Sequence, residues 1–165
     1  MGTAMASWLV SNVVVNNIPP ASLSAAGSVV GGTGRFSITG SGDSFGDALA
    51  ASVGAVDVAG IAKWRALGGA IRSHIIAQGR ANPTSYVANP LGGPVTGAGT
   101  LSFASTVFSP SLASVLGLTD ALNVAVWLAL GTAILGHISA NAVVGSLGFT
   151  SPSGGGPLVG VSVIT

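Results

Sequence analysis

The sequence repeats itself at a fixed offset of 63 residues. When the chain is shifted by that distance, Phe45–Ser102 aligns with Phe108–Thr165 without a gap, and 19 of the 58 aligned pairs are identical. The densest run aligns residues 64–75 with residues 127–138. Self-similarity at a fixed offset indicates that one structural unit occurs twice. Whatever fold suits the first copy must therefore also suit the second.

Each copy predicts one long helix. Asp57 in the first copy and Asp120 in the second suit the N-cap, where a carboxylate accepts hydrogen bonds from free backbone N–H groups. Apolar residues then recur every three or four positions, the period of an amphipathic helix, so we expect about 20 helical residues that end near Gly79 or Val144. The two apolar stripes are Ile61, Trp64, Leu67, Gly68, Ile71, His74 and Ile75, and Val124, Trp127, Leu130, Gly131, Ile134, His137 and Ile138.

The stripes also predict how the two helices pack. We expect the helices to touch along them as a pseudo-symmetric pair, with Trp64 and Trp127 as buried packing anchors. Gly68 and Gly131 lie within the stripes, where the absence of a side chain lets two helix backbones approach closely. The predicted packing and interface residues are Trp64, Leu67, Ile71, His74, Trp127, Leu128, Leu130, Ile134, Leu135 and His137.

Short strands complete the predicted fold. A glycine-rich loop follows each helix, and then a segment of alternating apolar and polar residues that is typical of a strand, at 100–103 and 161–164. A third such segment, 35–39, precedes the first copy. The predicted class is α+β: two tandem helix–loop–strand units and an N-terminal extended arm with a strand. We expect the arm at 1–44, interpreted as a decayed partial repeat, and the units at 45–107 and 108–165, all within one compact domain.

The chain carries very little charge. Five Lys/Arg and four Asp among 165 residues make 5% charged residues, against about 25% in ordinary soluble domains. Surfaces with so little charge associate or precipitate. The composition therefore favours a subunit buried in an assembly or a membrane over a free monomer. A net charge of +1 provides no drive toward nucleic acid, so no specific nucleic-acid partner is predicted.

The two copies differ in where this charge lies. Four of the five cations, Lys63, Arg65, Arg72 and Arg80, align with Val126, Leu128, Leu135 and Val143. We interpret the outer face of the first helix as solvated, and the same face of the second helix as covered by other protein. Leu128 and Leu135 are thus predicted to become buried on assembly, while Arg65 and Arg72 stay at least partly exposed.

The second helix raises a membrane alternative. The stretch from Ala121 to Gly136 is nearly all apolar. It spans only about 16 residues between Asp120 and His137, fewer than the roughly 20 needed to cross a bilayer. The first copy also places three cations in the corresponding helix, each costly at bilayer depth. A small membrane-associated protein is therefore the second interpretation, after an assembly subunit.

One motif suggests nucleophilic catalysis. The segment from Gly42 to Gly46 matches the G-x-S-x-G pattern that exposes a serine nucleophile, which would here be Ser44. No Asp-x-x-His sequence follows, and the second copy has Val107 at the aligned position. We interpret the motif as a turn, which leaves a serine hydrolase as the third hypothesis.

The two histidines suggest a metal site only weakly. His74 and His137 occupy equivalent stripe positions, but the chain has no cysteine and no glutamate to complete a ligand set. We expect each ring to bond a backbone carbonyl or to face an interface. No catalytic residue, cofactor or metal is predicted.

The repeated pattern resembles a known family. Each copy reads Trp-x-Ala-Leu-Gly-x-Ala-Ile-x-x-His-Ile and continues into a Gly-Gly-Pro loop and a terminal strand, over residues 57–101 and 120–164. This is similar to small virion structural proteins of tailed bacteriophages, although here the pattern is duplicated. The resemblance implies a non-enzymatic component of the tail, baseplate, neck or capsid surface. Its implied partners are copies of itself and other virion proteins, and its implied location is the virion, assembled in the host cytoplasm.

Overall fold

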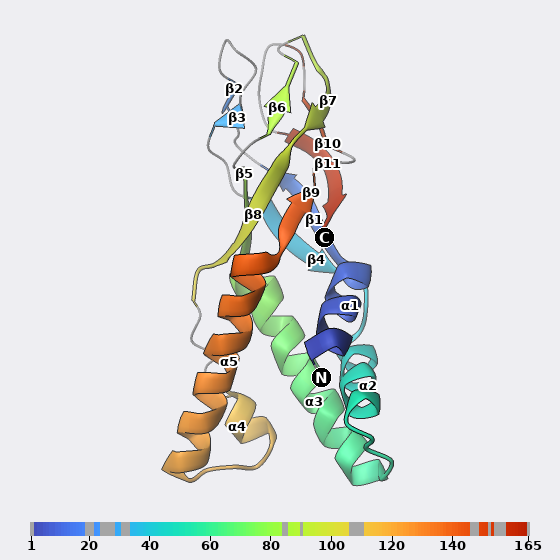
Figure 1. Cartoon of the computed structure of the whole chain (residues 1–165), viewed down its shortest axis with the longest axis vertical. Helices are drawn as coiled ribbons and strands as arrows, with labels where there is room; N and C mark the ends of the chain where they lie inside the picture. Colours follow the sequence, from blue (N-terminus) through green and yellow to red (C-terminus); the bar gives the residue numbers. More distant parts are fainter. Residues whose placement is uncertain are drawn as a thin grey trace. The chain divides into compact units, whose positions relative to one another are not determined.

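The computed structural model describes residues 2–18, 22–23, 29–30, 34–83, 86–89, 91–105, 111–145, 149–151, 153 and 158–164. It contains both helices and strands, so the predicted α+β class is confirmed (Figure 1). The helices are α1 (Gly2–Asn12), α2 (Gly42–Ser52), α3 (Val58–Gln78), α4 (Ser111–Val115) and α5 (Ala121–Asn141). The strands are β1 (Val13–Ile18), β2 (Ser22–Leu23), β3 (Val29–Val30), β4 (Gly34–Ile38), β5 (Gly79–Pro83), β6 (Val87–Ala88), β7 (Gly93–Thr96), β8 (Ala98–Phe103), β9 (Val143–Gly145), β10 (Phe149–Ser151) and β11 (Leu158–Val163).

The two long helices lie where the sequence predicts them. Helices α3 and α5 each have 21 residues. Asp57 Oδ1 accepts a hydrogen bond from the Gly60 backbone N–H at 2.6 Å, and Asp120 Oδ1 accepts one from the Asn123 N–H at 2.9 Å. The side chain and backbone of Asn123 both donate to Asp120 and lower the pKa of its carboxyl group. Both N-caps and both helix lengths are thus confirmed.

The predicted strands are found as β4, β8 and β11. The arm is extended only in part, because residues 2–12 form helix α1. Met5, Trp8 and Leu9 are the buried residues of α1, and their spacing of three and four places them on one helix face. The apolar stretch from Trp8 to Val15 therefore divides between α1 and β1.

The chain divides into two compact units, each assembled from three stretches of sequence. The helical unit comprises residues 1–12, 38–78 and 105–137, and the sheet unit comprises residues 13–37, 79–104 and 138–165. Each unit thus draws on the arm and on both copies, so the spatial division differs from the predicted sequence boundaries at 44 and 107. Helix α2 already begins at Gly42, ahead of the first boundary.

The sheet unit holds a nine-stranded sheet in the order β6-β7-β10-β11-β1-β4-β5-β8-β9, and β2 pairs separately with β3. A bridge from Val144 in β9 to Ile164 connects the last strand back to the end of β11. Six strands (β11, β1, β4, β5, β8 and β9) are therefore connected into a ring, which this one bridge closes. The buried apolar residues described in these strands and at the end of β11 include Val13, Val15, Ile38, Ala81, Leu101, Val144 and Ile164.

The same chain order occurs three times in this fold. Helix α1 continues directly into β1, α3 continues directly into β5, and only Ala142 separates α5 from β9. Each of these strands then neighbours a later one, as β1 with β4, β5 with β8, and β9 with β11 through its bridge. The arm shares this order with the two copies. Its interpretation as a partial repeat, like the duplication itself, remains a prediction from the sequence.

Among the described residues of the sheet unit, Tyr86 has the largest fully buried side chain. Its hydroxyl lies 3.0 Å from the carbonyl oxygen of Val144 and 2.9 Å from that of Gly145, and it can donate a hydrogen bond to either. Its ring meets Phe149 edge to face, with 5.9 Å between ring centroids. A Cβ at Gly99 would lie 3.0 Å from the Tyr86 hydroxyl oxygen, so this glycine leaves room for the ring. Burial raises the pKa of Tyr86 from 10.0 to about 12.

This burial predicts a loss of stability at alkaline pH. The neutral phenol is favoured in the folded chain, so its contribution is fully present below the unfolded pKa of about 10 and is lost as pH rises toward 12. Tyr86 is the only tyrosine of the chain, so ultraviolet absorbance of tyrosinate reports this group alone. We expect a midpoint near 12 in the folded protein and near 10 in urea. Tyr86→Phe should remove the alkaline loss, whereas equal midpoints in both states would contradict the burial.

Helices α2 and α3 of the helical unit pack backbone against backbone. A Cβ at Gly68 of α3 would lie 2.5 Å from the Gly46 nitrogen and 2.7 Å from the Gly42 carbonyl oxygen, both in α2. A Cβ at Gly46 would in turn overlap the backbone of Arg65. The prediction that Gly68 brings the two long helices together is therefore wrong. The close approach is instead made with α2, the helix that immediately precedes α3 in the chain.

Candidate interaction surface

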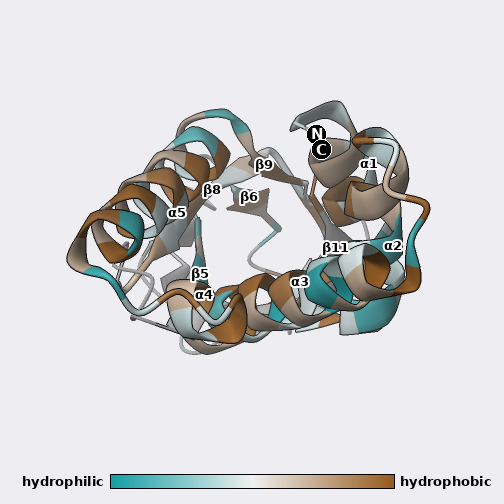
Figure 2. Cartoon of the chain, turned by 90° about the horizontal axis from the view of Figure 1, so that it is seen from below, coloured by the Kyte–Doolittle hydropathy of each residue, from teal (hydrophilic) through white to brown (hydrophobic). Residues whose placement is uncertain are grey.

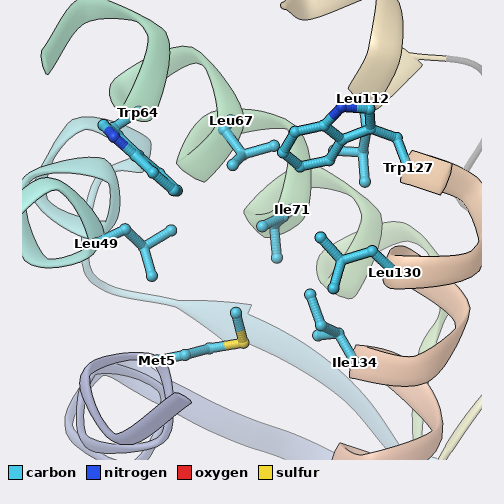
Figure 3. A pocket seen from close by; sticks show the side chains of 9 residues that line it. All are labelled: Met5, Leu49, Trp64, Leu67, Ile71, Leu112, Trp127, Leu130 and Ile134. Carbon is cyan, nitrogen blue, oxygen red and sulfur yellow. The ribbon is translucent and has the colours of Figure 1, made fainter. Parts of the chain in front are cut away.

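The stripes of α3 and α5 face each other across an apolar pocket in the helical unit. Figure 3 shows Trp64, Leu67 and Ile71 of α3 on one side and Trp127, Leu130 and Ile134 of α5 on the other. Side chains of the neighbouring helices complete the lining, namely Met5, Leu49 and Leu112. With a volume of about 20 Å³, the pocket is a narrow apolar seam. Six of the ten predicted packing residues thus line the same pocket.

A larger cavity adjoins this seam and shares Trp64, Leu67 and Trp127 with it. Its volume is about 190 Å³, and its remaining lining residues are Gly60, Lys63 and Leu116. Trp64 and Trp127 are half-buried, so neither is the fully buried anchor that the sequence predicts. Truncating either tryptophan to alanine should therefore cost less than the roughly 3–5 kcal/mol expected for a buried aromatic side chain.

Trp8, in contrast, is a buried tryptophan of the helical unit. Its ring stacks on Phe45 of α2 at 4.3 Å between centroids, and its Nε1–H donates to the Ser44 hydroxyl oxygen at 3.2 Å. The Ser44 backbone N–H donates to Ser41 Oγ at 3.0 Å, and the Ser44 hydroxyl donates to the Ser41 carbonyl oxygen at 2.9 Å. Ser44 thus belongs to the capped first turn of α2, where it also anchors Trp8 of α1.

The exposure of the aligned side chains in α3 and α5 agrees only partly with the prediction. Leu135 has no exposed surface in the single chain, so the prediction that it becomes buried only on assembly is wrong. Arg72, at the aligned position of α3, is half-buried and donates to the carbonyl oxygens of Gly40 and Ile38 at 2.7 and 2.8 Å. This position faces the interior in both helices. Leu128 has an exposed fraction of 38% and remains a candidate for burial on assembly.

The solvated face of α3 is formed by Lys63 and Arg65, both exposed. The Arg65 guanidinium donates to both carboxylate oxygens of Asp47 on α2, at 2.7 and 3.1 Å, and these hydrogen bonds lower the pKa of Asp47. Arg80 does not belong to this face, because it lies in β5, half-buried, and donates to the Gly79 carbonyl oxygen. The predicted exposure of Arg65 is therefore confirmed.

The two histidines have different surroundings. His74 is half-buried, and its Nε2–H donates to the Ser105 carbonyl oxygen at 3.0 Å, as the sequence predicts for a ring near the helix end. His137 is exposed on α5. Across the described part of the chain, no three His, Cys, Asp or Glu side chains gather in a way that could hold a metal ion.

Helix α5 is uncharged over its full length and is largely uncovered within the single chain. Only Gly131 and Leu135 are buried, whereas Leu122 and Val126 keep 76% and 55% of their surface exposed. Figure 2 shows hydrophobic residues on most turns of this helix, while α3 carries hydrophilic patches. A helix that is apolar on all sides is normally covered on all sides, by protein or by lipid.

The length of α5 corrects the sequence argument against a membrane. The helix has 21 residues with a mean hydropathy of 1.7 in its most apolar window, and within the described residues it alone is long and apolar enough to cross a bilayer. Asp120 lies outside the helix and His137 lies inside it, so the distance between them understates the helical length. Length therefore does not exclude a span. The cations of α3 remain the argument against one.

The turn before α3 exposes apolar side chains that were not singled out from the sequence. Val56 and Val58, on either side of the N-cap Asp57, keep 89% and 86% of their surface exposed. The turns before α3 and α5 are alike in backbone, because Gly54 and Gly117 both adopt a left-handed conformation, with φ of 71° and 72°. The absence of polar residues from 53 to 56 could have revealed this apolar tip.

Comparison of the chain with protein-family models, with curated proteins and with solved structures gives no match to any of them.

Proposed function

We propose that this protein is a non-enzymatic structural subunit that acts by packing against copies of itself and against other subunits, as a component of a bacteriophage virion. Tail, baseplate, neck and capsid surface are the particle regions that the sequence resemblance suggests. The observation that carries the proposal is helix α5, which has 21 residues, contains no Asp, Glu, Lys or Arg, and exposes the apolar side chains of Leu122, Val126 and Leu128.

The physical argument rests on the cost of leaving such a helix in water. Burial of apolar surface contributes about 25 cal/mol per Å², so each exposed leucine or valine of α5 favours any contact that covers it. The exposed residues of α3 at the aligned positions, Lys63 and Arg65, are charged, whereas those of α5 are Val126 and Leu128. This exposed face is therefore charged in α3 and apolar in α5, as expected if only α5 is covered in an assembly.

A charge-restoring double variant tests this proposal. Val126→Lys with Leu128→Arg places the exposed side chains of α3 on α5, at positions that are already exposed in the single chain. We expect a folded protein that no longer assembles, because two unpaired cations in a contact cost several kcal/mol. Size-exclusion chromatography with light scattering measures assembly, and circular dichroism confirms folding.

A matched control adds the same charges elsewhere. Ala6→Lys with Val10→Arg alters exposed residues of α1, and Val10 has an exposed fraction of 47%, similar to that of Val126. This variant should assemble like the wild type. Assembly of the α5 variant at wild-type levels would show that its face meets solvent, and the proposal would then be wrong.

The length and exposure of α5 also favour a second candidate, a small membrane-associated protein. A helix of 21 residues is about 31 Å long, close to the hydrocarbon thickness of a bilayer. The two candidates differ in how the wild-type chain is purified. An assembly subunit forms particles or defined oligomers without detergent, whereas recovery only in detergent micelles would favour the membrane.

A further inference from the structure

The turn between α2 and α3 presents an apolar tip with a negative charge. Val56 and Val58 are the most exposed large apolar residues in the described part of the chain. Asp57 lies between them, and its Oδ1 is used for the helix cap while no described residue donates to Oδ2. The tip thus offers two uncovered isopropyl groups on either side of a carboxylate.

The cavity beside this tip is lined by apolar side chains and by a lysine, whose charge is opposite to that of the tip. It is lined by Trp64, Leu67, Leu116 and Trp127, and its volume is about 190 Å³. An apolar cavity of about 150 Å³ is large enough to hold benzene, so this one can hold an isopropyl group. Lys63 also lines it, is exposed, and forms no ion pair among the described residues.

Tip and cavity belong to the same end of the same molecule. The tip lies at the start of α3, whose first residue is Val58, and Gly60 and Lys63 of the cavity lie in the first two turns of that helix. The same surface therefore carries a protrusion with an anion and a cavity with a cation. The protrusion of one copy is complementary in shape and charge to the cavity of another copy. Self-complementary surfaces associate about a two-fold axis, where each contact occurs twice.

We propose that two copies of this chain associate through this end of the helical unit. The apolar tip at Val56 and Val58 of one copy enters the cavity between Trp64 and Trp127 of its partner, and Asp57 pairs with Lys63 across the contact, in both directions. The inference rests on the proposed function as an assembly subunit and names one contact of that assembly.

The apolar part of the contact is tested on the full chain without detergent. Val56→Asp with Val58→Asp should raise the dimer dissociation constant more than about 30-fold, since it places unpaired carboxylates in an apolar cavity. Val10→Asp, on an exposed residue of α1, is the control and should leave the constant unchanged. Sedimentation equilibrium measures association, and circular dichroism confirms folding.

The ionic part is tested by exchanging charges. Lys63→Asp and Asp57→Lys should each weaken self-association, because like charges then face each other across the axis. An equimolar mixture of the two variants should associate again, since one variant then carries a cation at both positions and the other carries a carboxylate at both, so that opposite charges meet in each contact. Asp57→Asn keeps a capping side chain and separates the loss of charge from the loss of the helix cap.

The outcomes distinguish this inference from the proposed function. If the wild type assembles and the tip variants assemble equally well, or if the mixture of charge variants does not associate, this contact is wrong while an assembly subunit remains supported. If the wild type is recovered only in detergent micelles, or if the tip is needed for binding to lipid vesicles but not for self-association, a membrane occupies the tip and the inference is overturned.

Discussion

Leu135→Arg is expected to unfold the helical unit, whereas Leu128→Arg leaves it folded. Leu135 has no exposed surface, so an arginine there is a buried charge without a partner and should destabilise the fold by roughly 3–5 kcal/mol. Leu128 has an exposed fraction of 38%, and its aligned residue in α3 is the exposed Arg65. Urea unfolding followed by circular dichroism compares the two variants directly.

The partners of Arg72 explain why the aligned arginine is tolerated in α3. Arg72 donates to the carbonyl oxygens of Ile38 and Gly40. At an offset of 63 residues, these two positions fall on Leu101 and Phe103 of β8, which pairs with β5 and β9. The residue of α5 aligned with Arg72 is Leu135, which has no side-chain donor for such carbonyl oxygens. A Leu135→Arg variant with wild-type unfolding behaviour would show that α5 can supply other acceptors.

Alanine at two neighbouring glycines of α3 is expected to have opposite effects. Gly68→Ala should destabilise the helical unit by about 1–3 kcal/mol or more, because its Cβ would lie 2.5 Å from the Gly46 nitrogen and neither backbone can yield cheaply. A Cβ at Gly69 meets nothing within 4 Å, so Gly69→Ala should stabilise the helix by about 0.5–1 kcal/mol through its better helix propensity.

The denaturant concentration at the midpoint of unfolding measures both effects, when each single variant is compared with the wild type. The pair controls for local helix propensity, since both substitutions exchange glycine for alanine in adjacent positions of one helix. Gly136 of α5 offers a second control, because its Cβ would also meet nothing within 4 Å. Equal shifts for Gly68→Ala and Gly69→Ala would contradict the close packing of α2 on α3.

Both long helices could be predicted, to within a residue for α3 and to within three residues at the end of α5, because their determinants are local. The caps at Asp57 and Asp120 use hydrogen bonds to residues three positions further along. The apolar period of three and four is likewise contained in one helix, and alternation over a few residues identified β4, β8 and β11. The same local spacing identified Trp64 and Trp127 as members of the apolar stripes of α3 and α5.

The contacts between elements could not be predicted in the same way. Gly68 lies in the stripe of α3, but whether it meets α5 or α2 depends on which helix reaches it, and the short turn after α2 places that helix first. The sequence predicted that Leu128 and Leu135 both lie on the outer face of α5, because both align with arginines of α3. Only the structure shows that Arg72 donates inward to backbone carbonyls while Arg65 pairs with Asp47 at the surface.

What the sequence alone determined is the set of elements and their amphipathic patterns, since these depend on hydrogen bonds and spacings within a few residues. The tertiary structure alone decided which faces meet, because packing joins residues far apart in the chain. The seam between Ile71 and Ile134, and the cavity that Lys63 shares with Trp127, exist only once α3 and α5 face each other. The run from 53 to 56 could be recognised as apolar, but the exposure of Val56 could not be predicted, because a side chain is exposed only where no other part of the chain covers it.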